Sequence, residues 1–294
     1  MGMGAALMAA CLWAFASIVY GRLGQVLSPL WLNLLKGGMA IAMLLVSACC
    51  LGQPWPQIPG LNLLMLLGSG AFGIGLGDTA YFGAINRLGA RRCLLLKALS
   101  PAVGSLLSWL WLQEALSGLA ILGMAITIFG ITWVVSERSR EPGRSNVDAI
   151  GLGLGLAAAV LEGLGAVLAH GALIQSGVDP LWSATIRLVG GMAIVVPLLL
   201  YETGSAPQEK KPWPKLLLII AVASFFSTFL GLWLQQIALK YSPTGIAQTL
   251  GATSPLFVLP MARLMGERLS GRAILGAVVA LIGVAILVLY SPHE

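Results

Sequence analysis

The chain has 294 residues, of which 58% are hydrophobic and only 10% charged, and its mean hydropathy is +0.91. This composition excludes an ordinary soluble domain. The net charge of +6 lies in short segments between apolar runs, which favours contact with anionic lipid headgroups rather than nucleic acid. These features predict a helical integral membrane protein.

Ten apolar runs follow one another along the chain, and a helix of about 20 residues spans the hydrocarbon core of a bilayer. They cover residues 3–20, 29–51, 61–82, 93–113, 116–136, 149–175, 180–201, 216–239, 243–263 and 269–290. The runs are continuous rather than alternating, which excludes a transmembrane β-barrel. The first run lacks a basic n-region, which is atypical of a cleaved signal peptide.

The chain contains an internal repeat, with two copies of one sequence unit about 153 positions apart. The glycine spacing Gly118–Gly123–Gly130 returns as Gly271–Gly276–Gly283, and Ser100-Pro101 returns as Ser254-Pro255. We therefore expect two repeats, 1–136 and 149–290, with five helices each. Because five is odd, the second repeat should be inverted in the membrane. Such repeats place a substrate site near the bilayer midplane and expose it alternately to either side.

These features resemble a known family. The turns at 113–118 and 266–271, the Ser-Pro helix and the glycine-spaced last helix resemble the EamA-type module of the drug/metabolite transporter superfamily. The resemblance covers nearly the whole chain as two tandem modules. It implies a basket of ten helices that moves small metabolites, often amino acids, across the cytoplasmic (inner) membrane. The motif residues serve packing and turns, so the resemblance names no substrate.

The basic residues bear on orientation, because Lys and Arg gather in short cytoplasmic loops. Thirteen of the seventeen follow the odd-numbered runs: Arg22, Arg87, Arg91, Arg92, Arg138, Arg140, Arg144, Lys210, Lys211, Lys215, Arg263, Arg268 and Arg272. This bias favours both termini outside the cytoplasm, whereas the family resemblance favours both inside. Both orientations remain open.

Charged residues inside the runs are candidates for function, because a charge in lipid is costly. Lys36 and Arg187 each lie seven residues after the proline that opens their helix, so the repeat makes them counterparts. We expect them to gate or bind an anionic substrate group such as a carboxylate. Snorkelling to the interface is the alternative. Asp78 is expected to be a charge partner for Lys36 or Lys97, or else a solvated helix end.

Two further residues are candidates for proton coupling. Glu162 lies near the middle of the sixth run as a lone carboxylate, and its approximate counterpart in the first repeat is Trp13. The small multidrug transporters of the same superfamily similarly carry a glutamate in their first helix. His170 is the only histidine within a run and titrates near neutrality in its unperturbed form. The alternative for both residues is a neutral, hydrogen-bonded packing group.

Neutral residues complete the candidate substrate site. Gln235 and Gln248 are placed to hydrogen-bond a substrate or a neighbouring helix, and Trp13 and Tyr81 to stack on it. Pro101 and Pro255 occupy equivalent places, where each should kink its helix and expose carbonyl groups. All these roles are hypotheses from residue type and position.

Other chemistry finds no support in the sequence. No Walker motif, nucleophile–His–acid set or Cys-x-x-Cys spacing is present, so we expect neither an enzyme nor a metal or other cofactor. The sequence favours a secondary active carrier, driven by protons or by the substrate gradient, acting as a monomer or homodimer. A lipid-linked substrate flippase and a passive channel or accessory membrane subunit remain alternatives. The substrate and the direction of transport, import or export, stay open.

Overall fold

The computed structural model describes residues 1–24, 26–88, 93, 96–137, 148–201, 213–257, 260 and 271–290, and within these ranges the chain is helical without β-strands. Five helical segments are long and apolar enough to cross a membrane: Pro29–Cys50, Gly60–Leu88, Ala149–Ser176, Pro180–Tyr201 and Trp213–Tyr241. Shorter apolar helices lie at Gly2–Ala16, Gly118–Trp133 and Ile274–Ile286. The all-helical, membrane-type fold is confirmed, and the count of ten spans stays a prediction.

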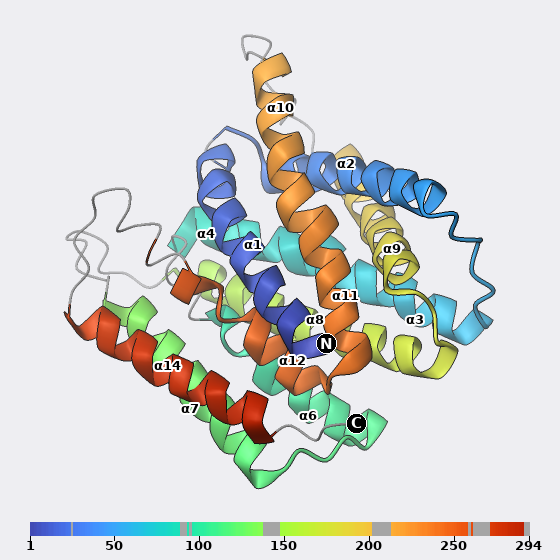
Figure 1. Cartoon of the computed structure of the whole chain (residues 1–294). Helices are drawn as coiled ribbons and strands as arrows, with labels where there is room; N and C mark the ends of the chain where they lie inside the picture. Colours follow the sequence, from blue (N-terminus) through green and yellow to red (C-terminus); the bar gives the residue numbers. More distant parts are fainter. Residues whose placement is uncertain are drawn as a thin grey trace.

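The helices form one bundle, with the first and second halves of the chain interleaved (Figure 1). The first half contains α1 (Gly2–Leu23), α2 (Pro29–Cys50), α3 (Gly60–Gly70), the π-helix η1 (Ala71–Asp78), α4 (Thr79–Leu88), α6 (Ser100–Leu112) and α7 (Gly118–Glu137). The second half contains α8 (Ala149–Ser176), α9 (Pro180–Tyr201), α10 (Trp213–Ser224), the π-helix η2 (Phe225–Leu230), α11 (Gly231–Tyr241), α12 (Thr244–Gly251) and α14 (Gly271–Tyr290).

Local sequence explains several of the helix ends. Ser28 caps α2, and Pro29 stands in the first turn, where its missing N–H costs nothing. The Asp148 side chain accepts hydrogen bonds from the backbone N–H groups of Ile150 and Gly151 at the start of α8. Gly177 ends α8 in the left-handed conformation, at φ 65°, which favours glycine.

The duplication extends to the backbone. Helices α3 and α10 each pass into a π-helix, and a shift of 153 positions places η2 (Phe225–Leu230) within η1 (Ala71–Asp78). A π-helix changes the backbone hydrogen-bond pattern and often marks a functional site. Equivalent carbonyl groups accept a side-chain donor in both: Asn33 Nδ2 donates to Ile74 O at 2.9 Å, and Trp13 Nε1 donates to Ser227 O at 3.0 Å.

The sequence predicts that Pro101 and Pro255 each kink a continuous helix, and the structure differs from this prediction. The helix is interrupted by a turn at 98–99, and α6 then begins at Ser100 with Pro101 in its first turn. Pro255 likewise follows a turn at 252–253, beyond the end of α12. Proline fits a first turn because it needs no N–H partner there. Pro101 and Pro255 therefore restart a broken helix instead of bending a continuous one.

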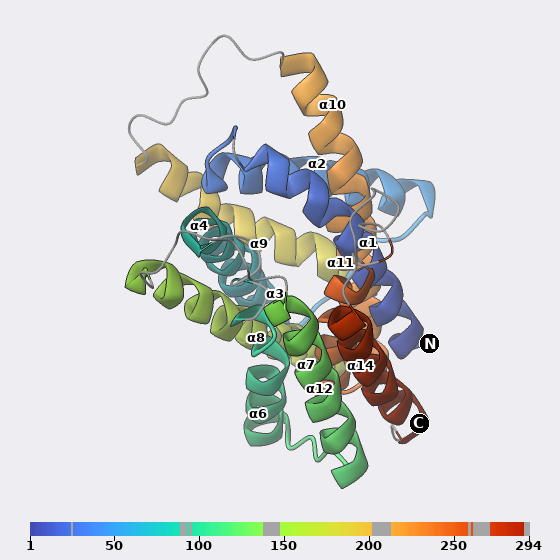
Figure 2. The same ribbon diagram turned by 90° about the vertical axis from the view of Figure 1, so that its left-hand side faces the viewer.

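The last helices of the two repeats, α7 and α14, pack directly against each other, and they lie side by side in both views (Figures 1 and 2). Gly130 abuts Ala280, and Gly283 abuts Thr127. These contacts are reciprocal, because each joins the same two positions of the repeat. Residue numbers rise in one helix as they fall in the other, so α7 and α14 run antiparallel.

We predict that Gly283→Ala destabilises the protein by about 1–3 kcal/mol, as overpacking does. The added methyl group would lie 2.5 Å from Thr127 N and 2.8 Å from Gly123 O, where the backbone cannot yield. Gly153→Ala is the matched control, since nothing lies within 4 Å of its added methyl group. It should be neutral or stabilising by about 0.5–1 kcal/mol. Thermal unfolding in detergent measures both, and equal effects would contradict the packing role of Gly283.

Candidate functional site

Helices η1, α8 and α9 approach one another closely because glycines stand at their contacts. A methyl group on Gly165 of α8 would lie 2.9 Å from Ser69 O and 3.0 Å from Gly73 Cα, and the Ser69 hydroxyl donates to Gly165 O. Gly70 abuts the backbone of Arg187 on α9. Small residues allow such backbone contact between membrane helices. The result is that charged side chains from three helices lie around one point.

Two ion pairs form there. Lys36 Nζ on α2 contacts Asp78 Oδ2, at the end of η1, and also lies 5.2 Å from the centre of the Phe82 ring. Lys97 Nζ lies 3.4 Å from Glu162 Oε2 on α8 and 4.8 Å from the centre of the Tyr81 ring. Each carboxylate therefore has its own lysine, and both lysines also contact an aromatic ring.

Arg187 lies in the same place but lacks a carboxylate partner among the described residues. Its side chain is buried, and its Nη1 donates to Gln235 Oε1 on α11 at 3.4 Å, a long hydrogen bond. Its Nε has no hydrogen-bond partner in the described part of the chain. Asp78 and Glu162 are near enough to attract it electrostatically. We call these residues the charged cluster: Lys36, Asp78, Tyr81, Lys97, Glu162, Arg187 and Gln235.

Most of the sequence-predicted site residues come together in the charged cluster. Lys36, Arg187, Asp78, Tyr81, Gln235 and Glu162 are all members. The expectation that Glu162 is a lone carboxylate is wrong, because Lys97 pairs with it. Residue spacing does not reveal this pair, since it joins two separate helices. The roles assigned to these residues stay predictions.

Trp13 and Gln248 make their hydrogen bonds outside the charged cluster. Trp13 binds η2 through Ser227, and its ring packs against Gly231 and Gly251. Gln248 on α12 accepts a hydrogen bond from the Ser100 hydroxyl at 2.9 Å and abuts Gly104. Both side chains join one helix to another. A substrate-binding role for either stays a prediction.

His170 belongs to a separate network with Glu114, which the sequence reasoning did not select as a functional residue. His170 Nε2 lies 2.5 Å from Glu114 Oε1, and His170 Nδ1 donates to the carbonyl of Leu239. Glu114 also accepts from the Ser108 hydroxyl and, at 3.3 Å, from Thr244 N. The network joins α8, the segment before α7, and the adjacent ends of α11 and α12. The sequence signal that could have identified Glu114 is its recurrence as Glu267 in the second repeat.

The hydrogen bonds around Glu114 determine its charge state. Burial acts to raise the pKa of this carboxyl, but the hydrogen bond and charge of His170, with the donors Ser108 and Thr244, lower it below its usual value. Glu114 is therefore ionised at neutral pH.

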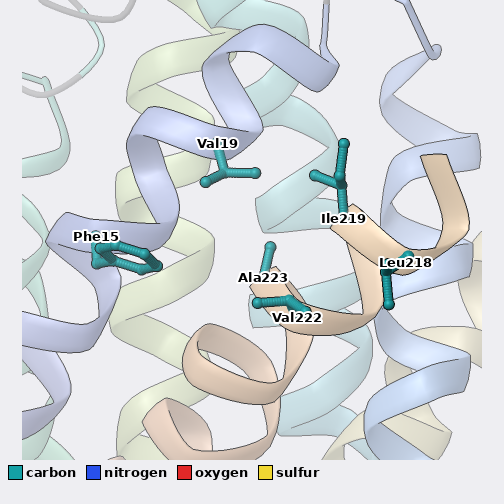
Figure 3. A pocket seen from close by; sticks show the side chains of 6 residues that line it. All are labelled: Phe15, Val19, Leu218, Ile219, Val222 and Ala223. Carbon is teal, nitrogen blue, oxygen red and sulfur yellow. The ribbon is translucent and has the colours of Figure 1, made fainter. Parts of the chain in front are cut away.

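An apolar crevice lies between α1 and α10 (Figure 3). It has a volume of about 270 Å³ and is lined by Phe15, Val19, Leu218, Ile219, Val222 and Ala223. Val222 and Ala223 are the repeat counterparts of Ser69 and Gly70, which stand where α3 packs closely against α8 and α9. Equivalent positions are thus tightly packed in one copy and border a crevice in the other.

Within the described residues, no group of three or more His, Cys, Asp or Glu side chains is arranged to hold a metal ion. The four cysteines, Cys11, Cys49, Cys50 and Cys93, are free thiols. Arg91 and Arg92, with most of the basic residues that bear on orientation, lie outside the described residues.

Comparisons with known proteins agree with this architecture. A family model described as "EamA-like transporter family" matches residues 1–136 and 149–289, which are the two repeats. A solved structure titled "Crystal structure of protein" is 16% identical, with a TM-score of 0.77, and the match covers 100% of this chain and 99% of that one. At this identity the likeness shows the fold alone. No curated protein matches significantly.

We predict that Glu114→Gln lowers the stability at pH 7 by about 1–3 kcal/mol, because it removes a partly buried charge-assisted network. A lowered pKa means that ionised Glu114 stabilises the fold above its unfolded-state pKa of about 4.3. This stabilisation is lost as the pH falls through the folded-state value. Unfolding temperatures from pH 8 to pH 3.5 should therefore converge for wild type and variant on the acidic side. A constant difference would contradict the role of the charge.

Proposed function

The chain belongs to the EamA-like transporter family of the drug/metabolite transporter superfamily, and on that premise we propose that it is a secondary active carrier. It is a multi-pass membrane transporter. We propose further that it moves a small amino-acid-like or amphipathic metabolite across the cytoplasmic membrane by alternating access. The charged cluster, half-buried where glycines bring three helices together, is the observation that carries this proposal.

The antiparallel contact of α7 and α14 supports inverted repeats. Gly130–Ala280 and Thr127–Gly283 are related by exchange of the two copies, as a two-fold axis requires. If both helices span the membrane, this axis lies in the membrane plane and the copies have opposite orientation. Ten spans, five in each copy, are consistent with that arrangement.

The difference between the copies supports alternating access. In carriers with inverted repeats, equivalent interfaces open and close in turn. Here the α3–α8 contact is closed through Ser69 and Gly165, while its counterpart between α1 and α10 borders a crevice. In this proposal the substrate binds at the charged cluster. The substrate gains access when the closed interface opens and its counterpart closes.

Glu162 is the group that we propose for proton coupling. Its carboxylate lies 3.4 Å from Lys97, so a proton on Glu162 removes the attraction that holds this ion pair. The contact between α8 and the segment that precedes α6 then loses its ion pair. Binding and release of one proton at Glu162 thereby favours different arrangements of α8. His170 is the second candidate, since it connects the same helix to Glu114 and Leu239.

A lipid-linked substrate flippase is the second candidate function. The apolar crevice between α1 and α10 favours it, because an acyl or polyprenyl chain requires an apolar lateral opening. A flippase would take the headgroup at the charged cluster. Saturable counterflow of water-soluble metabolites distinguishes the carrier from this candidate and from a passive channel.

We expect purified protein in liposomes to catalyse saturable counterflow of a radiolabelled amino-acid and organic-acid mixture. Glu162→Gln should leave this exchange intact and abolish uptake driven by a pH gradient, because the amide cannot exchange a proton. Asp148→Asn is the matched control, since Asp148 caps α8 and pairs with Arg87 outside the charged cluster. It should behave like wild type. Unchanged pH-driven uptake in Glu162→Gln would remove Glu162 from the coupling mechanism.

A further inference from the structure

We infer that Arg187 is the anchor for a carboxylate group of the substrate, and that Lys36 and Lys97 are not. This inference rests on the proposed function and specifies the substrate class of the same site. It follows from the charges of the cluster, from the comparison of the two repeats and from the unsatisfied hydrogen-bond donors of one side chain.

The charged cluster contains one cation more than it has carboxylates. Asp78 neutralises Lys36, and Glu162 neutralises Lys97. Arg187 is the third cation, with an amide, Gln235, as its hydrogen-bond partner. Among the described residues the cluster therefore carries a surplus of one positive charge. A solute with one carboxylate compensates that surplus.

Comparison of the two copies shows which acidic residue the second copy lacks. In the first copy, Lys36 pairs with Asp78 at the end of η1. Arg187 corresponds to Lys36 when their helices are aligned at the opening prolines, 151 positions apart, and the residue 153 positions after Asp78 is Gly231. The second copy thus keeps the cation and lacks its acid. A glycine at this position lets the indole of Trp13 pack against the helix, which fills the space of an acidic side chain.

A buried guanidinium without a carboxylate partner is energetically costly, because its charge is removed from water without compensation. Only 4% of the Arg187 surface is exposed, its Nε has no partner among the described residues, and its bond to Gln235 is long at 3.4 Å. Guanidinium presents parallel N–H donors that match the two oxygens of a carboxylate. A bound carboxylate would neutralise the charge of Arg187 and accept a hydrogen bond from its Nε.

The neighbours of Arg187 favour selection of an anion at this residue. Asp78 and Glu162 attract Arg187 from a distance, but each is held in contact with its own lysine. A carboxylate that approached Lys36 or Lys97 would meet the acid already bound there. A carboxylate that binds Arg187 displaces only the weak contact with the Gln235 amide. The same two acids are placed to repel a second negative charge, which favours a monocarboxylate over a dicarboxylate.

Gln235→Glu tests the inference, because it places a carboxylate of the same shape beside Arg187 Nη1. We expect this variant to unfold at a higher temperature than wild type and to stop responding to external carboxylates. The probes are propionate and the isosteric, uncharged propionamide at matched ionic strength. Propionate, but not propionamide, should raise the unfolding temperature of wild type by about 2 °C or more, as a ligand of the folded state does.

Gln175→Glu is the matched control, because this substitution makes the same charge change at an exposed residue. The Gln175 side chain also accepts a hydrogen bond, from Asn62. It should keep the wild-type response to propionate. Arg187→Gln should lose the response while its unfolding transition remains cooperative. An equal effect of propionamide, no effect of propionate on wild type, or a full propionate response in Gln235→Glu would each overturn the inference.

Counterflow separates this inference from the proposed function. If Arg187→Gln exchanges the same solutes at wild-type rates, the carrier stands and the carboxylate anchor fails. If wild type shows no counterflow at all, the carrier fails, and the propionate response still reports whether Arg187 binds a carboxylate.

Discussion

A charge enclosed by apolar helices has to find a partner inside the protein, because hydrocarbon cannot solvate it. This constraint explains the arrangement of the charged cluster. Lys36 contacts Asp78, and Lys97 contacts Glu162, across helices that are distant in sequence. Gly70 packs α3 against α9, and Gly165 packs α8 against α3 and η1, so these glycine contacts place both ion pairs close to Arg187.

The two repeats share a scaffold and differ in chemistry. Both contain a π-helix at the same position, and in both an equivalent carbonyl group accepts a side-chain hydrogen bond. Around η1 the neighbours are charged, with Glu162 on α8. Around η2 they are aromatic and hydroxyl-bearing, with Trp13 on α1 and Tyr20 bound to Ser227 at 2.8 Å. Duplication thus produced a symmetric framework with one ionic half and one aromatic half.

The network of His170 and Glu114 is a second polar contact on α8, nearer the C-terminal end of that helix than Glu162. It connects α8 to the segment before α7 and to the turn before α12. Helix α8 therefore has ionisable contacts at two depths, one with Lys97 and one with Glu114. A movement of α8 relative to the other helices has to break or rearrange both, and this double attachment is the reason that we propose α8 as the link between protonation and conformation.

The sequence by itself determined the fold class, the duplication and the family, because apolar length and glycine spacing are properties of the linear chain. It also selected six of the seven members of the charged cluster as site residues, since a charge or an amide in an apolar run is conspicuous. Only the tertiary structure decided the pairing. Lys97 with Glu162, and Glu114 with His170, join helices far apart in the chain. Spacing along the chain gives the face and depth of a residue, but which side chain lies opposite depends on how the helices pack.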